Sequence, residues 1–305
     1  MAKGKGSMFF SIFARGAAMG AAEVVPGVSG GTIALLVGVY DRLIVAISTI
    51  ASPAIKELRG KGGFARFWKA IDGNFLVSLL LGMGAAVLLF SRVLTSLLLN
   101  YPVQVWAAFF GLIVASIWLV GRGVQWDVAP AIMAAVGIAV GYLVSTAGGG
   151  SLPEGALGLF IGGAVAICAM ILPGISGSFI LLLLGRYHEV IGAVSVLDFA
   201  VLIPFALGAL IGLLAFSHVL SWFLKCYHNS TIALLTGFMA GAIVKVWPWR
   251  MQVGAEPGLD RAVSPSAYAA VHSDSHVAVA IAIAVVACAF VLVLGYLENR
   301  KKAKA

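Results

Sequence analysis

Charged side chains are scarce in this chain of 305 residues. Asp, Glu, Lys and Arg make up 10% of the residues, against about 25% in an average soluble domain. Hydrophobic residues make up 61%, and the mean hydropathy is +1.05. So few polar side chains cannot cover a water-facing surface. The composition therefore excludes soluble enzymes, soluble nucleic-acid-binding proteins and secreted domains, and it indicates an integral membrane protein.

Cysteines and catalytic motifs are also scarce. The three cysteines, Cys168, Cys226 and Cys288, have no CxxC or metal-ligand spacing, so we expect neither a disulfide framework nor a bound metal. The sequence has no HExxH motif and no Walker phosphate-binding loop. We therefore expect no cofactor, and we predict that the protein is not an enzyme.

Long apolar stretches fill most of the chain. A helix that spans a bilayer needs about 20 mostly apolar residues. Two apolar regions, 8–50 and 154–196, are each interrupted by Pro, Gly and Ser, which leaves open whether 8–22 and 154–171 are half or full spans. We predict an all-α membrane protein with two re-entrant helical hairpins in these regions. Six uninterrupted stretches predict full spans: 74–99, 103–121, 127–146, 199–224, 228–247 and 277–297.

The two interruptions belong to an internal repeat. Residues 25–44 and 172–191 are identical at ten of twenty positions, at an offset of 147. A second match, Phe-Ser-x-Val-Leu in both halves, aligns Arg92 with His218 at an offset of 126. These two residues are candidates for a polar path through the membrane, and snorkelling of the side chains toward a helix end is equally open. We predict one polytopic domain, 1–305, with repeat 1 at 8–121, repeat 2 at 154–247, and additional spans at 127–146 and 277–297.

Basic residues predict how the repeats are oriented. They cluster at 56–66 and at 300–304, beside apolar stretches, as is typical of cytoplasmic segments. If both clusters are cytoplasmic, the number of spans between them requires the first interrupted region to begin and end inside and the second outside. The repeats then have opposite orientations, as in many secondary transporters. Both termini are predicted to be cytoplasmic.

Each interruption reads Pro-Gly-x-Ser-Gly, beginning at Pro26 and at Pro173. Proline removes a backbone donor and glycine permits positive φ, so we expect a break at mid-membrane and a new half-helix from Gly30 or Gly177, capped by the preceding serine. The free N–H groups of such a half-helix attract an anion. Alternatively, these small residues only allow helices to pack closely. The predicted anion site consists of Pro26, Gly27, Ser29, Gly30, Gly31, Thr32, Pro173, Gly174, Ser176, Gly177 and Ser178.

Ionisable residues near the interruptions are further candidates for function, because charge inside a membrane is costly. Arg15 and Arg186 flank the two breaks, and we predict that they contribute to anion binding. Glu23, His188 and Glu189 are candidates for carrying a coupling ion.

The residues around the breaks resemble those of a known family. Gly16-Ala17-Ala18-Met19-Gly20-Ala21-Ala22-Glu23, the following Pro26–Thr32 and the repeated Leu172–Ser178 are similar to bacterial polyprenyl-phosphate transporters of the PopT type, formerly a domain of unknown function. The resemblance covers almost the whole chain. It implies a flippase that returns undecaprenyl phosphate, the lipid carrier of envelope polymer synthesis, from the outer to the cytoplasmic leaflet of the bacterial plasma membrane. The partners it implies are this lipid and the surrounding membrane lipids; the oligomeric state stays open.

The implied direction of transport has an energetic cost. Moving one negative charge inward against an inside-negative potential costs about 2.3 kcal/mol per 100 mV. We therefore expect co-transport of a cation, H⁺ or Na⁺, with Glu23 or His188 as the proton carrier. Two other functions use the same residues: a secondary transporter of a small water-soluble anion, and a lipid-phosphate enzyme or scaffold, which would not change the leaflet distribution of the lipid.

Overall fold

The computed structural model describes residues 2–23, 29–50, 63–146, 152–174, 176–252, 260–272 and 274–302, and nearly all of them are helical. The chain divides into two compact units. Unit 1 contains residues 1–92 and 148–228, and unit 2 contains residues 93–147 and 229–305. Unit 1 therefore takes the first part of both sequence repeats, including both Pro-Gly-x-Ser-Gly motifs.

Unit 1 holds the two broken regions. Its helices in repeat 1 are α1 (Ala2–Glu23), α2 (Gly30–Leu36), α3 (Tyr40–Ile50), α4 (Gly63–Ala70) and the first part of α5 (Gly73–Asn100). Its helices in repeat 2 are α8 (Gly155–Ile171), α9 (Gly177–Leu183), α10 (Tyr187–Val196) and α11 (Phe199–Cys226). After each short helix the chain bends sharply, by 119° between α2 and α3 and by 120° between α9 and α10.

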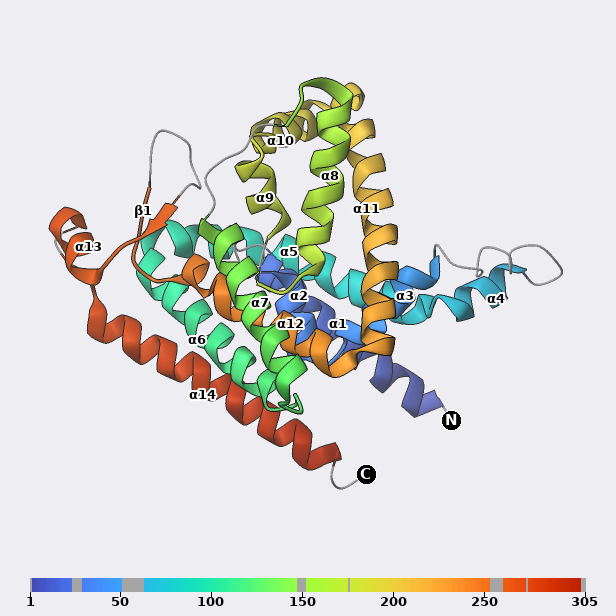
Figure 1. The fold of residues 1–305 in the computed structure, drawn as a ribbon, viewed down its shortest axis with the longest axis horizontal. Coiled ribbons are helices and arrows are strands. Elements are labelled where there is room, and N and C mark those ends of the chain that lie inside the picture. Colours follow the sequence, from blue (N-terminus) through green and yellow to red (C-terminus); the bar gives the residue numbers. More distant parts are fainter. Residues whose placement is uncertain are drawn as a thin grey trace. The chain divides into compact units, whose positions relative to one another are not determined.

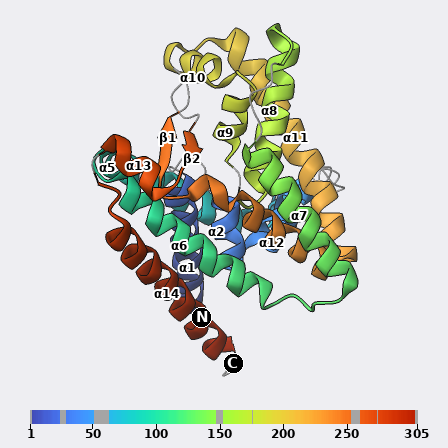
Figure 2. The same ribbon diagram turned by 60° about the vertical axis from the view of Figure 1, so that its left-hand side comes forward.

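The equivalent helices of the two repeats run in opposite directions. Figure 1 shows α1 leading up from the N-terminus toward α2, while α8 descends and α9 returns beside it toward α10; Figure 2 shows the same courses. A Cβ atom at Gly177, the first residue of α9, would lie 2.7 Å from the Ala166 carbonyl oxygen of α8, so the two helices are in backbone contact. This arrangement confirms the predicted inverted repeats with hairpin-like breaks.

Glycines bring α8 and α11 together. A Cβ atom at Gly163 of α8 would collide with the Phe205 carbonyl of α11, and one at Gly208 of α11 would collide with the Phe160 carbonyl of α8. Small residues at such positions let helix backbones approach closely in a membrane, where no hydrophobic effect drives helices together. The glycine-rich composition therefore has a packing role in unit 1.

Unit 2 consists of helices and one short two-stranded sheet. Its helices are α6 (Pro102–Gly121), α7 (Val128–Thr146), α12 (His228–Ala242) with the 3-10 turn η2 (Ile243–Val246), α13 (Pro265–His272) and α14 (Val277–Lys302). Strand β1 (Arg250–Gln252) pairs antiparallel with β2 (Asp260–Ala262). Trp249 and Tyr268 are buried with Val103 and Ala280, so the described residues 248–252, 260–272 and 274–276 include side chains that pack against α6 and α14.

Five helices are long and apolar enough to cross a membrane, and each bent pair adds one further candidate span. The five correspond to five of the six predicted spans. In the sixth, within α14, the apolar part of the described chain is the shorter stretch Val277–Val293. Helix α8 has 17 residues and thus a length of about 26 Å at 1.5 Å per residue, slightly less than the hydrocarbon core of a bilayer. The protein is therefore a multi-pass, all-α membrane protein.

Candidate functional site

The first break separates α1 from α2. Ser29 is the N-cap of α2, and its hydroxyl accepts a hydrogen bond from the Gly31 N–H at 3.0 Å, as predicted. The side chain of Glu23, the last residue of α1, accepts from the Gly30 N–H at 2.7 Å. A carboxyl group of the chain itself thus occupies the start of this half-helix. Two predicted site residues of this break, Pro26 and Gly27, lie outside the described residues.

The second break separates α8 from α9. Pro173 and Gly174 are buried, and Gly174 has a φ of 96°, which glycine adopts without strain. Ser176 stands at the N-cap of α9 but makes no side-chain capping bond, which corrects the expectation that it caps the half-helix as Ser29 does. Its hydroxyl instead lies 2.7 Å from the hydroxyl of Ser178, which is exposed. Ser29 and Ser176 therefore have similar backbone angles and differ in their side-chain bonding.

The two breaks meet inside unit 1. The Ser29 hydroxyl donates to the Met170 carbonyl at 3.1 Å and to the Leu172 carbonyl at 3.2 Å. The Gly174 N–H donates to the Thr32 hydroxyl at 2.8 Å. Ser29 and Thr32 are fully buried. Residues of the first half-helix thus satisfy backbone groups that the second break leaves without helical partners.

Tyr40 and Gly31 complete this junction between the breaks. The Tyr40 hydroxyl, at the start of α3, donates to the Ile171 carbonyl at 3.1 Å. A Cβ atom at Gly31 would lie 2.6 Å from the same carbonyl oxygen, so only glycine fits there without displacing the second break. Sequence reasoning missed the role of Tyr40, although its match with Tyr187 in the repeat was a signal.

Ser29 is also the centre of a Gly-Val-Ser-Gly-Gly sequence, which matches the letters of the nucleophile elbow of serine hydrolases. That motif sits on a strand-to-helix turn with the serine exposed and a histidine beside it. Ser29 is instead fully buried after a helix, and its hydroxyl bonds to backbone groups of residues 31, 170 and 172. Its surroundings do not fit a nucleophile.

A cavity of about 200 Å³ lies beside the first break. Its walls are mostly aliphatic side chains, and its polar margin is formed by Glu23, Gly30 and Gly31. Tyr40 is the other titratable residue of the lining, and its hydroxyl is bonded to Ile171. The cavity thus combines an apolar space with backbone amides and one carboxyl group. The aliphatic walls are Met19, Leu43, Ile44, Ile47, Leu79, Leu80, Met83, Ile167, Met170, Ile171 and Leu213.

The two repeats differ where Glu23 stands. At the repeat offset of 147, the residue equivalent to Glu23 is Met170, whose side chain cannot titrate. Thr32 is likewise replaced by Phe179. Only the first break therefore carries a carboxyl group at the start of its half-helix.

Arg186 lies at the far end of α9 from the break. Its guanidinium Nη1 is 2.6 Å from the Glu189 carboxylate, and Nη2 donates to the carbonyls of Leu152 and Pro153, which precede α8. A helix of seven residues, about 10 Å long, separates it from Gly177. His188 is exposed and contacts Tyr187 edge-on. The structure thus places Arg186, His188 and Glu189 together, away from the paired breaks.

The remaining predicted residues lie on the long helices. Arg15 is half-buried on α1, two turns before Glu23. Arg92 belongs to α5, and its side chain lies outside the described part of the structure. His218 is exposed on α11.

Comparisons with known proteins place the chain in a family. A family model described as undecaprenyl phosphate translocase-like matches residues 19–257. A polyprenyl-phosphate transporter of Vibrio cholerae is 42% identical over 255 residues, which cover 81% of this chain and 80% of that protein. A polyprenyl-phosphate transporter of Staphylococcus aureus is 33% identical over 253 residues, 77% of this chain and 84% of that protein. No solved structure matches significantly. The chain therefore belongs to the undecaprenyl phosphate translocase-like family.

Proposed function

We propose that the chain is a flippase that moves undecaprenyl phosphate from the outer to the cytoplasmic leaflet of the bacterial plasma membrane. The observation that carries this proposal is the pair of breaks that meet beside an apolar cavity, in a chain whose relatives are named polyprenyl-phosphate transporters. A polyprenyl tail can remain in hydrocarbon while its phosphate crosses. The transporter then needs a polar site at mid-membrane that opens onto an apolar one.

The phosphate is proposed to bind at the breaks, on the amides and hydroxyls of the two Pro-Gly-x-Ser-Gly motifs. The Gly30 N–H already donates to an oxygen of the Glu23 carboxyl group. Glycines leave room for a phosphate oxygen to approach the backbone. The first units of the lipid tail would then occupy the cavity beside Glu23, whose walls are aliphatic.

Glu23 is the proposed carrier of a coupling proton. A negative charge that moves inward against the membrane potential costs about 2.3 kcal/mol per 100 mV, and one proton carried along cancels that charge. Protonation also weakens the hold of Glu23 on the Gly30 N–H, because a neutral carboxyl group is a poorer acceptor than a carboxylate. The lipid phosphate can then replace the Glu23 carboxyl group at the Gly30 N–H.

Both termini are proposed to be cytoplasmic, as the basic clusters indicate.

Arg186 is proposed to contact the phosphate on its way to the breaks, and its pairing with Glu189 provides a test. The Glu189→Gln variant removes the competing carboxylate while Arg186 stays in place. We expect it to lower the half-saturating concentration of polyprenyl phosphate about threefold, and Arg186→Gln to raise it by at least as much. If Arg186 only holds α9 and α10 against residues 152 and 153, both variants will lower thermal stability and neither will tighten lipid binding.

Translocation in proteoliposomes tests the proposed function. The purified chain would be reconstituted with a fluorescent polyprenyl phosphate, and the fraction of lipid accessible to an external quencher would be followed with and without ion gradients. We expect the folded protein to move the lipid between leaflets faster than protein-free vesicles. Uptake of a small anion into sealed vesicles, without lipid translocation, would show a transporter of a water-soluble anion instead.

A further inference from the structure

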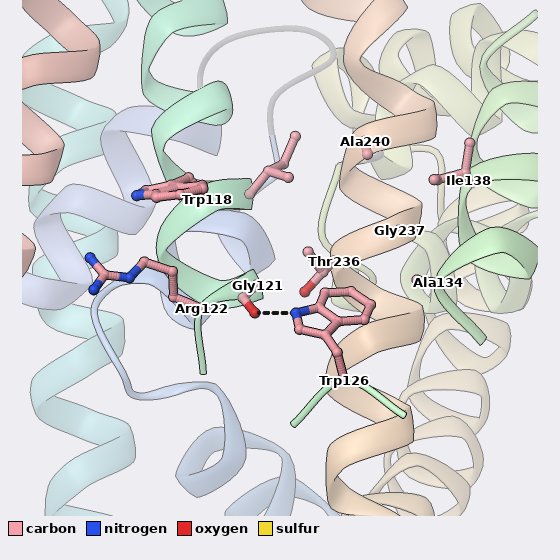
Figure 3. A pocket seen from close by; sticks show the side chains of 10 residues that line it. Trp118, Gly121, Arg122, Trp126, Ala134, Ile138, Thr236, Gly237 and Ala240 are labelled. Atoms are coloured by element: carbon pink, nitrogen blue, oxygen red, sulfur yellow. Dashed lines mark hydrogen bonds between the residues drawn. The ribbon is translucent and has the colours of Figure 1, made fainter. Parts of the chain in front are cut away.

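Unit 2 contains a second cavity, which the proposed transport mechanism does not use. Its volume is about 450 Å³, within the range of small-molecule binding sites. Figure 3 shows it between the end of α6, the second half of α12 and the middle of α7. Its lining is almost wholly apolar: Ile117, Ala134, Ile138, Gly237 and Ala240 contribute, and the Thr236 hydroxyl is bonded within its own helix to Ile232 at 2.7 Å.

Two indoles and one guanidinium form the margin of this cavity. Trp118 and Trp126 are 58% and 56% exposed, and tryptophans of this kind are typical of membrane–water interfaces. The guanidinium of Arg122 lies 5.8 Å from the centre of the Trp118 ring. Within the described part of the chain, Arg122 is the one charged residue of the lining, and no carboxylate pairs with it.

The margin is held in place by hydrogen bonds. The indole N–H of Trp126 donates to the Gly121 carbonyl at 3.0 Å, across the end of α6 (Figure 3). Asn229, at the start of α12, accepts from the Gln125 N–H at 2.8 Å and donates to the Gln125 carbonyl at 2.5 Å. These hydrogen bonds tie the segment between α6 and α7 to the end of α6 and to the start of α12.

We propose that this cavity binds the apolar end of a single-chain phosphorylated lipid, with the phosphate on Arg122. The apolar walls suit a hydrocarbon chain, and a guanidinium with an exposed side chain and no carboxylate partner suits a phosphate. The single apolar cavity accommodates one hydrocarbon chain, and the single cation, Arg122, pairs with one phosphate group. A phospholipid would leave its second chain without a groove.

This inference rests on the proposed function, because the single-chain phosphorylated lipid is the transporter's own substrate. The basic clusters predict that the segment between α6 and α7 is cytoplasmic. The cavity would therefore hold the lipid phosphate in the leaflet to which it is delivered. Since the cavity lies wholly in unit 2, it is a site separate from the paired breaks in unit 1.

Photolabelling of the full-length chain tests the proposal. The probe is a short polyprenyl phosphate with a photoreactive group on its chain, used in proteoliposomes, and labelled peptides are identified by mass spectrometry. Competitors are unlabelled polyprenyl phosphate, the uncharged polyprenol and phosphatidylglycerol. Two variants target the cavity: Arg122→Gln removes the charge and Ile138→Trp fills the space. Their controls are Lys225→Gln, at the end of another helix, and Ile132→Trp, exposed on α7 outside the cavity.

We expect saturable labelling of 117–126 and 236–240, displaced by polyprenyl phosphate at lower concentrations than by the other two lipids. Arg122→Gln should raise the half-saturating concentration about fivefold, and Ile138→Trp should remove the labelling, while the controls behave as the wild type. Equal displacement by phosphatidylglycerol would overturn the proposal in favour of a bulk-lipid site. Absence of labelling in a protein that translocates the lipid would also overturn it. Labelling that depends on Arg122, in a protein without translocation, would uphold the binding site and refute the flippase.

Discussion

The Glu23→Gln variant is expected to lose proton-driven transport of polyprenyl phosphate while keeping its fold. In the wild type, the Glu23 carboxyl accepts from the Gly30 N–H at 2.7 Å, at the place proposed for the phosphate. Two unit negative charges 4 Å apart repel by about 4 kcal/mol at an effective dielectric constant of 20. In the proposed mechanism, phosphate binding therefore requires a neutral carboxyl group, which glutamine imitates at every pH.

The sign of the pH dependence follows from this competition. A proton taken up on binding makes the affinity of the wild type for the lipid increase as the pH falls, up to tenfold per pH unit. The titration of the lipid phosphate changes the affinity of the wild type and of Glu23→Gln equally. The difference between the two proteins in the slope of affinity against pH therefore reports the titration of Glu23. Among the residues that line this cavity, the other titratable group is Tyr40, whose hydroxyl is bonded to Ile171.

Two measurements check this prediction: equilibrium binding of a short polyprenyl phosphate between pH 5.5 and 8.5, roughly the range in which phosphate monoesters titrate, and translocation under an imposed pH gradient. We expect the affinity of Glu23→Gln for the lipid to change less with pH than that of the wild type. We also expect this variant to translocate the lipid at the same rate whether the vesicle interior is the more acidic or the more alkaline side. Glu154→Gln, at the exposed N-cap of α8, is the matched control. A slope in Glu23→Gln equal to that of the wild type would refute Glu23 as the proton carrier.

The local features of the breaks could be predicted from the sequence. The half-helices begin at Gly30 and Gly177, as the Pro-Gly-x-Ser-Gly motifs indicated, because proline and glycine act on the backbone of their own neighbourhood. The bends of 119° and 120° after them follow from the repeated glycines Gly38 and Gly185, which have φ values of 69° and 68°. Glycine at the equivalent position of each repeat thus gave nearly the same bend.

The bonding between the breaks could not be predicted in this way. Ser29 finds its acceptors 141 and 143 residues away, and this pairing depends on how the two hairpins pack. Ser176, at the equivalent position, lies 2.7 Å from the hydroxyl of Ser178; the first repeat has Gly31 there, so Ser29 has no such hydroxyl beside it. A charged residue that is close to a break along the chain also need not lie beside it in space, since Arg186 lies at the end of α9 opposite to the second break.

The junction between the breaks leads to the second prediction of large effect. Ser29→Ala removes the donor to Met170 and Leu172, and Thr32→Val removes the acceptor of the Gly174 N–H. Each change leaves a buried backbone group without its partner, at a cost of about 1–3 kcal/mol. Because all three bonds hold the same contact between the breaks, we expect the double variant to lose less stability than the sum of the single variants.

Transport should fall as well as stability, because in the proposed mechanism the two half-helices are held together to present their amides to one phosphate. We expect the double variant to translocate at least tenfold more slowly than the wild type, which corresponds to about 1.4 kcal/mol in the barrier. Thermal unfolding in detergent and translocation in proteoliposomes measure the two effects. Ser116→Ala is the matched control, since this serine is buried in α6 and bonds only locally, to the Leu112 carbonyl at 2.7 Å. A double variant with wild-type transport would show that the contact between the breaks holds the fold together and has no part in moving the lipid.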